Sequence, residues 1–106
     1  MTRFDPQITL YRLLNEYTAR AHAIRRDLAN RHAMAAGDQA QLRQNDDVLQ
    51  ALLLEAEDAL RQVGLAKLRL AEGRYGLCLG CGSRISPERL EALPIAEYCL
   101  VCAERY

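Results

Sequence analysis

Residues 75–106, YGLCLGCGSRISPERLEALPIAEYCLVCAERY, contain all four cysteines of the 106-residue chain. The cysteines form two C-x2-C pairs, Cys78 with Cys81 and Cys99 with Cys102, and seventeen residues separate the pairs. The short turn within each pair lets two thiolates point at one centre, and four thiolates make the closed tetrahedral shell that suits zinc. The spacing therefore predicts a structural metal centre with no open coordination position for hydrolysis.

Three kinds of centre are compatible with two cysteine pairs: structural zinc, an iron–sulfur centre, and a disulfide or redox pair. The N-terminus carries no secretory signal, and no uncharged apolar stretch is long enough to span a membrane, so we expect a cytoplasmic protein. In a reducing cytosol, paired cysteines are more often metal ligands than disulfides. Structural zinc is the favoured interpretation, and the spacing permits the other two.

The segment ahead of the cysteines has the pattern of two long helices. The first is expected to begin at Asp5, a good N-cap, with Pro6 at the first helical position. Its apolar residues recur at alternating steps of four and three, which is the spacing of a heptad seam. They are Leu10, Leu14, Tyr17, Ala21, Ile24 and Leu28.

The second helix is predicted to follow a very short turn. Gly37 is a plausible end for the first helix, and Asp38 has the character of an N-cap with Gln41 as its capping-box partner. Apolar residues then recur at steps of three and four, with one polar residue among them. They are Leu42, Asn45, Leu49, Leu52, Ala56, Ala59, Val63, Ala66 and Leu70. Two helices of about thirty residues, at 1.5 Å per residue, predict an antiparallel hairpin roughly 45 Å long.

The expected fold is mainly α. A long antiparallel two-helix coiled coil would occupy residues 1–74, with its tip near residues 35–40. A small four-cysteine zinc finger with a short C-terminal helix would occupy residues 75–106. The composition agrees, since the chain is 50% hydrophobic but only 6% aromatic, which suits long helices better than a thick globular core.

The charge pattern restricts the function classes. Fourteen basic and fourteen acidic residues give a formal net charge of zero, so the totals do not indicate a nucleic-acid binder. The cysteine segment carries three arginines against four glutamates, which argues against phosphate binding. No Ser/His/Asp grouping or phosphate-binding glycine loop favours an enzyme. A coiled-coil adaptor and a nucleic-acid-binding zinc ribbon are the alternatives to the function developed next.

The cysteine segment resembles the zinc-finger signature of the DksA/TraR family. The residues that carry this resemblance are Tyr75, Gly76, Cys78, Cys81, Gly82, Ile85, Arg89, Leu90, Ala92, Pro94, Cys99 and Cys102. The resemblance implies a monomeric regulator that binds bacterial RNA polymerase and not DNA. Such a protein inserts its coiled coil in the secondary channel and alters open-complex stability at ribosomal RNA and biosynthetic promoters, as part of the stringent response.

The same resemblance indicates which residues work at the hairpin tip. The family's tip motif is Asp-x-x-Asp-x-Ala, and Asp38 and Ala40 match its second Asp and its Ala, while Ala35 replaces its first Asp. We therefore expect Asp38 and Ala40 to be the partner-binding residues. In relatives that respond to ppGpp, basic residues occupy the positions held here by Leu93 and Ala103, which argues against dependence on ppGpp.

Overall fold

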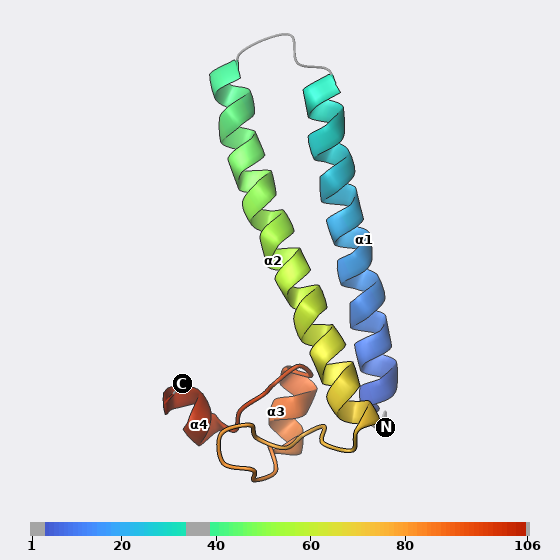
Figure 1. The fold of residues 1–106 in the computed structure, drawn as a ribbon, viewed down its shortest axis with the longest axis vertical. Helices are drawn as coiled ribbons and strands as arrows, with labels where there is room; N and C mark the ends of the chain where they lie inside the picture. The colour runs from blue at the N-terminus through green and yellow to red at the C-terminus, as the bar shows by residue number, and fades with distance from the viewer. Residues whose placement is uncertain (1–3, 34–38, 106) are drawn as a thin grey trace. The chain divides into compact units, whose positions relative to one another are not determined.

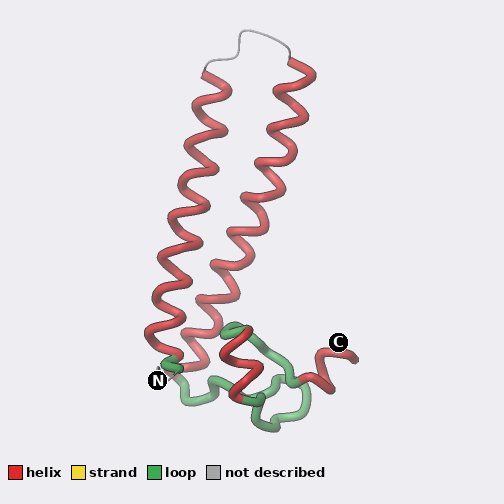
Figure 2. Tube along the Cα trace, turned by 180° about the vertical axis from the view of Figure 1, so that it is seen from behind, coloured by secondary structure: helices red, strands yellow, loops and turns green. Residues whose placement is uncertain are grey.

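The computed structural model of the chain describes residues 4–33 and 39–105, and the side chains of residues 32, 33 and 39–44 are not described. Four helices follow in order: α1 (Pro6–Ala33), α2 (Gln39–Ala71), α3 (Pro87–Ala92) and α4 (Leu100–Arg105) (Figure 1). The described residues form only helices and loops, with no named strand (Figure 2). One isolated bridge pairs Leu77 with Arg84. The expected mainly α fold, with two long helices ahead of the cysteines and a short one at the end, is confirmed.

The chain divides into two compact units. Met1–Leu13 and Gln62–Tyr106 make up one unit, and Leu14–Arg61 makes up the other. Each unit contains a segment of α1 and a segment of α2, while the cysteine segment belongs wholly to the first unit. The functional division expected between residues 74 and 75 stays a prediction.

The start of α1 is fixed by the cap expected from the sequence. Oδ1 of Asp5 accepts hydrogen bonds from the backbone N–H groups of Gln7 at 2.9 Å and Ile8 at 3.4 Å. These donors have no partner inside the helix, so the carboxylate satisfies them and stabilises the first turn by about 1 kcal/mol. The corresponding cap expected at Asp38 lies outside the described residues, as does the turn at Gly37.

Small residues dominate the seam of the Leu14–Arg61 unit. Ala21 and Ala56 are buried, whereas Leu52 is exposed at 46% although the heptad spacing places it on the same seam. A groove of about 310 Å³ runs beside Leu52, lined also by Tyr17 and Ile24, because the neighbouring alanines are too short to fill it. The predicted seam is therefore correct in direction but unevenly packed.

The other unit holds the larger buried side chains of the seam. Leu10 of α1 and Val63 of α2 are fully buried, and the ammonium of Lys67 lies 6.0 Å from the ring centroid of Tyr11. The Lys67–Tyr11 contact joins the first turns of α1 to the last turns of α2. None of the helices in the described ranges is long and apolar enough to cross a bilayer.

The end of α2 is set by Gly73, which has φ +74°. The N–H of Gly73 donates to the carbonyl of Leu70 at 3.2 Å, and the N–H of Arg74 donates to the carbonyl of Arg69 at 2.8 Å. This pair of bonds is the Schellman arrangement, in which a residue in the left-handed region closes the helix. It turns the chain directly into the cysteine segment.

Two glycines, one inside α2 and one just beyond its end, provide a matched test of this cap. Gly64 lies inside α2 and Gly73 lies just beyond its end, and an added Cβ would meet no atom within 4 Å at either position. We expect Gly64→Ala to stabilise the protein by about 1 kcal/mol through helix propensity. Gly73→Ala should destabilise it by about 1 kcal/mol, because φ is positive there.

The measurement is urea unfolding of both variants, followed by far-ultraviolet circular dichroism with zinc present. Since neither substitution causes a steric clash, the opposite signs isolate the backbone conformation. A change of the same sign in both variants would contradict the assignment of Gly73 as the helix-ending residue.

Candidate metal centre

The first cysteine pair lies on a tight loop whose backbone turns toward a sulfur. The N–H of Cys78 donates to the carbonyl of Ser83 at 2.8 Å, and the N–H of Gly82 donates back to the carbonyl of Cys78 at 2.9 Å. Gly82 has φ +76°, which a residue with a side chain rarely adopts. The N–H of Gly80 points at Sγ of Cys78, 3.3 Å away, so the loop presents a donor to the sulfur.

The second pair is held by a helix start. Cys99 immediately precedes α4, and Cys102 lies within it. Sγ of Cys99 accepts a hydrogen bond from the N–H of Cys102 at 3.5 Å, and the N–H of Ala103 donates to the carbonyl of Cys99 at 2.8 Å. The first turn of α4 therefore fixes the spacing between the two thiols and aims both toward the first pair.

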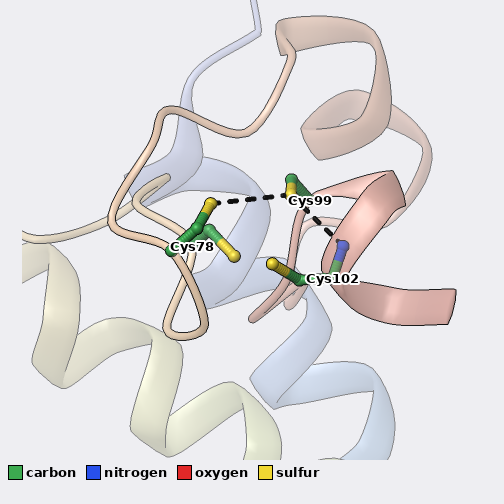
Figure 3. A group of neighbouring side chains, drawn as sticks. Cys78, Cys99 and Cys102 are labelled. Carbon is green, nitrogen blue, oxygen red and sulfur yellow. Dashed lines mark hydrogen bonds between the residues drawn. The ribbon is translucent and has the colours of Figure 1, made fainter. Parts of the chain in front are cut away.

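The four sulfurs gather at one point, as Figure 3 shows for the labelled residues Cys78, Cys99 and Cys102. All four Sγ atoms lie within 4.8 Å of one another, and Sγ of Cys81 is 3.9 Å from Sγ of Cys99. Four thiolates held about 2.3 Å from a central zinc ion would be about 3.8 Å apart along each edge of the tetrahedron. The observed cluster fits a single zinc ion with four thiolate ligands.

The metal centre forms much of the core of the finger. The buried residues here are Cys78, Ile85, Ala96 and Cys102, and Leu90, Tyr98 and Cys99 pack against them. Two of these four buried side chains are thiols. So small a core buries little apolar surface, so the bound metal must contribute much of the folding free energy of this segment.

Hydrogen bonds from outside the cluster position the two loops. Nε of Arg89 donates to the carbonyl of Tyr98 at 2.8 Å, next to the ligand Cys99, and the N–H of Leu79 donates to the carbonyl of Glu97 at 2.8 Å. The first bond links α3 to the second loop, and the second bond links the two loops directly. Such contacts around a metal site orient its ligands.

The short helix α3 is stabilised by its own cap. Oγ of Ser86 accepts a hydrogen bond from the N–H of Arg89 at 3.2 Å, and Pro87 occupies the first turn. A side chain at Gly76 would meet Cδ1 of Leu90 at 3.2 Å, so this glycine allows α3 to pack closely on the loop. The cap therefore places Arg89 where it can reach Tyr98.

Tyr75 links the start of the segment to the loop after α3. Its hydroxyl donates to the carbonyl of Pro94 at 2.8 Å. Burial raises the pKa of Tyr75 above its usual value, and the nearby guanidinium of Arg69 offsets part of that rise. The phenol stays neutral at physiological pH and remains a hydrogen-bond donor.

The thiols interact strongly with one another. Burial opposes ionisation of Cys78, but hydrogen bonds from the backbone of Cys99, Cys81 and Gly80 outweigh it and lower its pKa to about 6. Hydrogen bonds from Ser83 lower the pKa of Cys81. The Cys78 thiol and burial raise the pKa of Cys102 to about 12. Without a metal the four thiols would therefore ionise at different pH values. A divalent cation replaces their protons and can bind all four as thiolates.

The structure brings together the four cysteines that the sequence singled out. The role of Asp38 and Ala40 at the tip stays a prediction, because Asp38 and the side chain of Ala40 lie outside the described residues. Sequence reasoning missed the helix α3 and the Tyr75–Pro94 contact. A signal for α3 was present, since Ser86-Pro87 has the form of an N-cap followed by an N1 proline.

Comparison with known proteins agrees with this geometry. Residues 73–106 match the model of the prokaryotic dksA/traR C4-type zinc finger. Over 95% of its length, the chain is similar to the DnaK suppressor protein from Agrobacterium tumefaciens C58, with 35% identity, 90% coverage of that chain and a TM-score of 0.64. The chain belongs to the DksA/TraR family.

Two further relatives extend the comparison. The transcription factor DksA2 from Pseudomonas aeruginosa has 28% identity and a TM-score of 0.89, over 94% of this chain and 78% of that chain. An uncharacterized protein of Aquifex aeolicus (strain VF5) is 34% identical over 67 residues, or 63% of this chain. This chain spans only 46% of that Aquifex protein.

Together, the family match and the sulfur cluster assign one structural zinc ion to this DksA-family protein. The cysteines would hold the ion, and its four-thiolate shell is of the closed kind found in structural sites. Bound by all four cysteines, the ion would join the two cysteine loops, whose directions are set by the hydrogen bonds from Arg89 to Tyr98 and from Leu79 to Glu97.

Replacing one ligand should unfold the finger. We expect Cys102→Ser to purify with well under one zinc per chain, because a serine hydroxyl at neutral pH is not an anionic sulfur ligand. Metal analysis measures the zinc, and amide NMR signals of residues 75–105 report the loss of order. Glu91→Gln, on the exposed side of α3, is the control that should keep one zinc per chain. Full zinc retention in Cys102→Ser would contradict the four-thiol site.

The Arg89 contact makes a separate prediction. Arg89→Lys removes the Nε donor to the Tyr98 carbonyl, so we expect a loss of stability of about 1–3 kcal/mol and faster release of zinc to a colorimetric chelator. Arg84→Lys, at an exposed position of the same segment, is the matched control and should release zinc at the wild-type rate. Equal rates in all three proteins would show that Arg89 does not position the second loop.

Proposed function

We propose that this chain is an RNA polymerase-binding transcription regulator that inserts its helical hairpin in the secondary channel of the enzyme. In this proposal it changes the stability of open complexes at ribosomal RNA and biosynthetic promoters without binding DNA. The observation that carries the proposal is the combination of two long helices with a four-thiol finger of the DksA/TraR type. A similar protein of Pseudomonas aeruginosa is described as a transcription factor, which supports it.

The hairpin supplies the reach that such a mechanism needs. α1 has 28 residues and α2 has 33, and in the sequence they lie on either side of residues 34–38, which are outside the described residues. Their exposed surfaces are mixed in charge, with cross-helix ion pairs such as Arg25 to Glu57 at 3.5 Å. Exposed pairs of this kind add little stability, so they mainly keep the surface of the helices solvated. Within the proposal, Asp38 and Ala40, at the tip predicted from the sequence, act on the polymerase.

The charge of the finger supports a protein partner over a nucleic acid. Its arginines are outnumbered by its glutamates, and the guanidinium of Arg89 already binds the Tyr98 carbonyl. Phosphate contacts in nucleic-acid binding come from clusters of Lys and Arg, which this segment does not carry. Binding to generic DNA is therefore expected to be negligible.

The positions linked to ppGpp in responsive relatives carry no charge here. Leu93 is 43% exposed at the C-cap of α3, and Ala103 is exposed on α4. Neither side chain can bind a phosphate by charge or hydrogen bonding. Within the proposal, the effect on polymerase is therefore independent of ppGpp.

The decisive experiment is single-round transcription in vitro from a ribosomal RNA promoter, with purified bacterial RNA polymerase. We expect the wild-type protein to inhibit transcription. Asp38→Asn should bind polymerase normally but inhibit about tenfold less, because the amide cannot make the charge-assisted contact proposed for the carboxylate at the tip. Asparagine is chosen because it caps a helix as well as aspartate does, so that the fold is kept. Asp47→Asn, on an exposed site of α2, is the matched control and should inhibit like the wild type.

Each outcome separates one part of the proposal. If the wild type neither binds polymerase nor inhibits, the resemblance is architectural, and the adaptor interpretation replaces the proposal. Equal inhibition by wild type and Asp38→Asn would remove Asp38 from the mechanism. A repeat with ppGpp tests Leu93 and Ala103, since the proposal predicts no change in inhibition.

A further inference from the structure

A cavity of about 470 Å³ lies between the residues that begin α1 and the finger. All the residues that line it belong to one compact unit, Met1–Leu13 with Gln62–Tyr106. Its walls are mainly apolar and include Phe4, Leu77 and Leu90, together with Tyr75. We call it the Phe4 cavity. Concave sites of this size, with apolar and aromatic walls and a few polar groups, are typical of small-molecule binding.

One charged residue, Arg84, lines the Phe4 cavity, and the backbone fixes its place there. Arg84 lies directly opposite Leu77 in the isolated antiparallel bridge. Backbone hydrogen bonds flank this pair, among them the bond from the N–H of Ile85 to the carbonyl of Gly76 at 2.7 Å. Side chains of directly opposite residues lie on the same face and are neighbours. The bridge therefore holds a guanidinium-bearing side chain beside an apolar wall.

The guanidinium of Arg84 is available to a ligand. None of the described side chains forms an ion pair or a hydrogen bond with it. The carboxylates adjacent to lining residues in the sequence, Asp5 and Glu88, do not line the cavity, and Asp5 already caps α1. Ser86 does line it and has a hydroxyl that can donate. A guanidinium and a hydroxyl beside apolar walls are complementary to a carboxylate on an apolar body.

A second positive charge lies beside one wall of the cavity. Arg69 of α2 is only 7% exposed, and its Nη2 atom is buried without a hydrogen-bond acceptor among the described residues. Its guanidinium is close enough to Tyr75 to offset part of the rise that burial causes in the pKa of the phenol. A buried cation is costly unless an opposite charge compensates it. With Arg84 in the lining and Arg69 beside Tyr75, the local field favours an anion.

We propose that the Phe4 cavity binds a small monocarboxylate with an aromatic body. The ring would pack against Phe4 and Tyr75, and the carboxylate would accept hydrogen bonds from Arg84 and Ser86. A single guanidinium in the lining matches one carboxylate and not a polyphosphate. Because the ligand would contact both the residues that begin α1 and the finger, binding would stabilise the folded unit. The inference does not depend on binding to polymerase.

The test is an NMR titration of the full-length, zinc-loaded protein with three probes that share one body and differ in charge. They are phenylpropionate, phenylpropanol and phenylpropylammonium. The amide signals of Leu77, Ile85 and Leu90 report binding in the Phe4 cavity. Arg84→Gln removes the proposed partner of the carboxylate. Arg105→Gln, at an exposed position of α4 that does not line the cavity, is the matched control with the same change in net charge. Zinc content and circular dichroism first establish that each variant is folded.

We expect wild type and Arg105→Gln to bind phenylpropionate about tenfold more tightly than phenylpropanol, and to bind phenylpropylammonium most weakly. Arg84→Gln should bind the acid and the alcohol with equal affinity, because only the charge-assisted contact is lost. Leu77→Ser removes part of the apolar wall and should weaken binding of both probes by a common factor of about five.

Three outcomes would overturn the inference. One is equal affinity of the wild type for phenylpropionate and phenylpropanol, or the absence of saturable binding by either. Another is a preference for the acid that survives in folded Arg84→Gln. The third is a set of shifts centred on Leu10 and Lys67, which line a separate cavity of about 350 Å³. Transcription enters none of these readouts, so the function proposed above is tested independently.

Discussion

The rest of the finger depends on the bonding of four sulfurs to one ion. The two cysteine pairs are separated by seventeen residues, and the chain between them buries only Ile85 and Ala96 beside the thiols themselves. Burial of two such side chains cannot offset the conformational entropy of ordering about thirty residues. Coordination can, because metal binding of this kind contributes about 10–16 kcal/mol in zinc-finger peptides. The turns and short helices of the segment are therefore stable as consequences of the centre.

A series of hydrogen bonds connects the metal centre to the end of α2. Arg89 on α3 holds the loop ahead of Cys99, Tyr75 holds the loop after α3, and the Schellman turn at Gly73 delivers the chain to Tyr75. Each of these contacts is local, and each would be weak in an unfolded chain. A bound metal would already order both cysteine loops, so the hydrogen bonds of Arg89 and Tyr75 would form at little further entropic cost. Together they would hold the chain that follows α2 in one conformation.

The features that could be predicted from the sequence are those for which few residue types meet the chemical requirement. Few side chains bind zinc, and their positions must converge on one centre, so the spacing of the cysteines was sufficient to predict their cluster. The cap at Asp5 and the heptad seam were also predicted from the sequence. The heptad spacing placed both Leu52 and Ala56 on the seam, yet Ala56 is buried and Leu52 is 46% exposed. Periodicity specifies a direction around the helix, whereas burial depends on the size of every neighbour. α3 was missed because six residues are too few to show a period.

The finger and the proposed tip differ in what their residues must supply. In the finger, the cysteines supply thiolates to one centre, and Gly82 supplies a backbone φ of +76° that a residue with a side chain rarely adopts. In the proposed function, Asp38 acts through its charge, whereas the cap predicted for the same residue needs only a side-chain oxygen. Asparagine would therefore keep the predicted cap and remove the charge, so a substitution at Asp38 can separate activity from folding. No substitution at a cysteine can do this, because the thiolates that bind the metal also stabilise the fold.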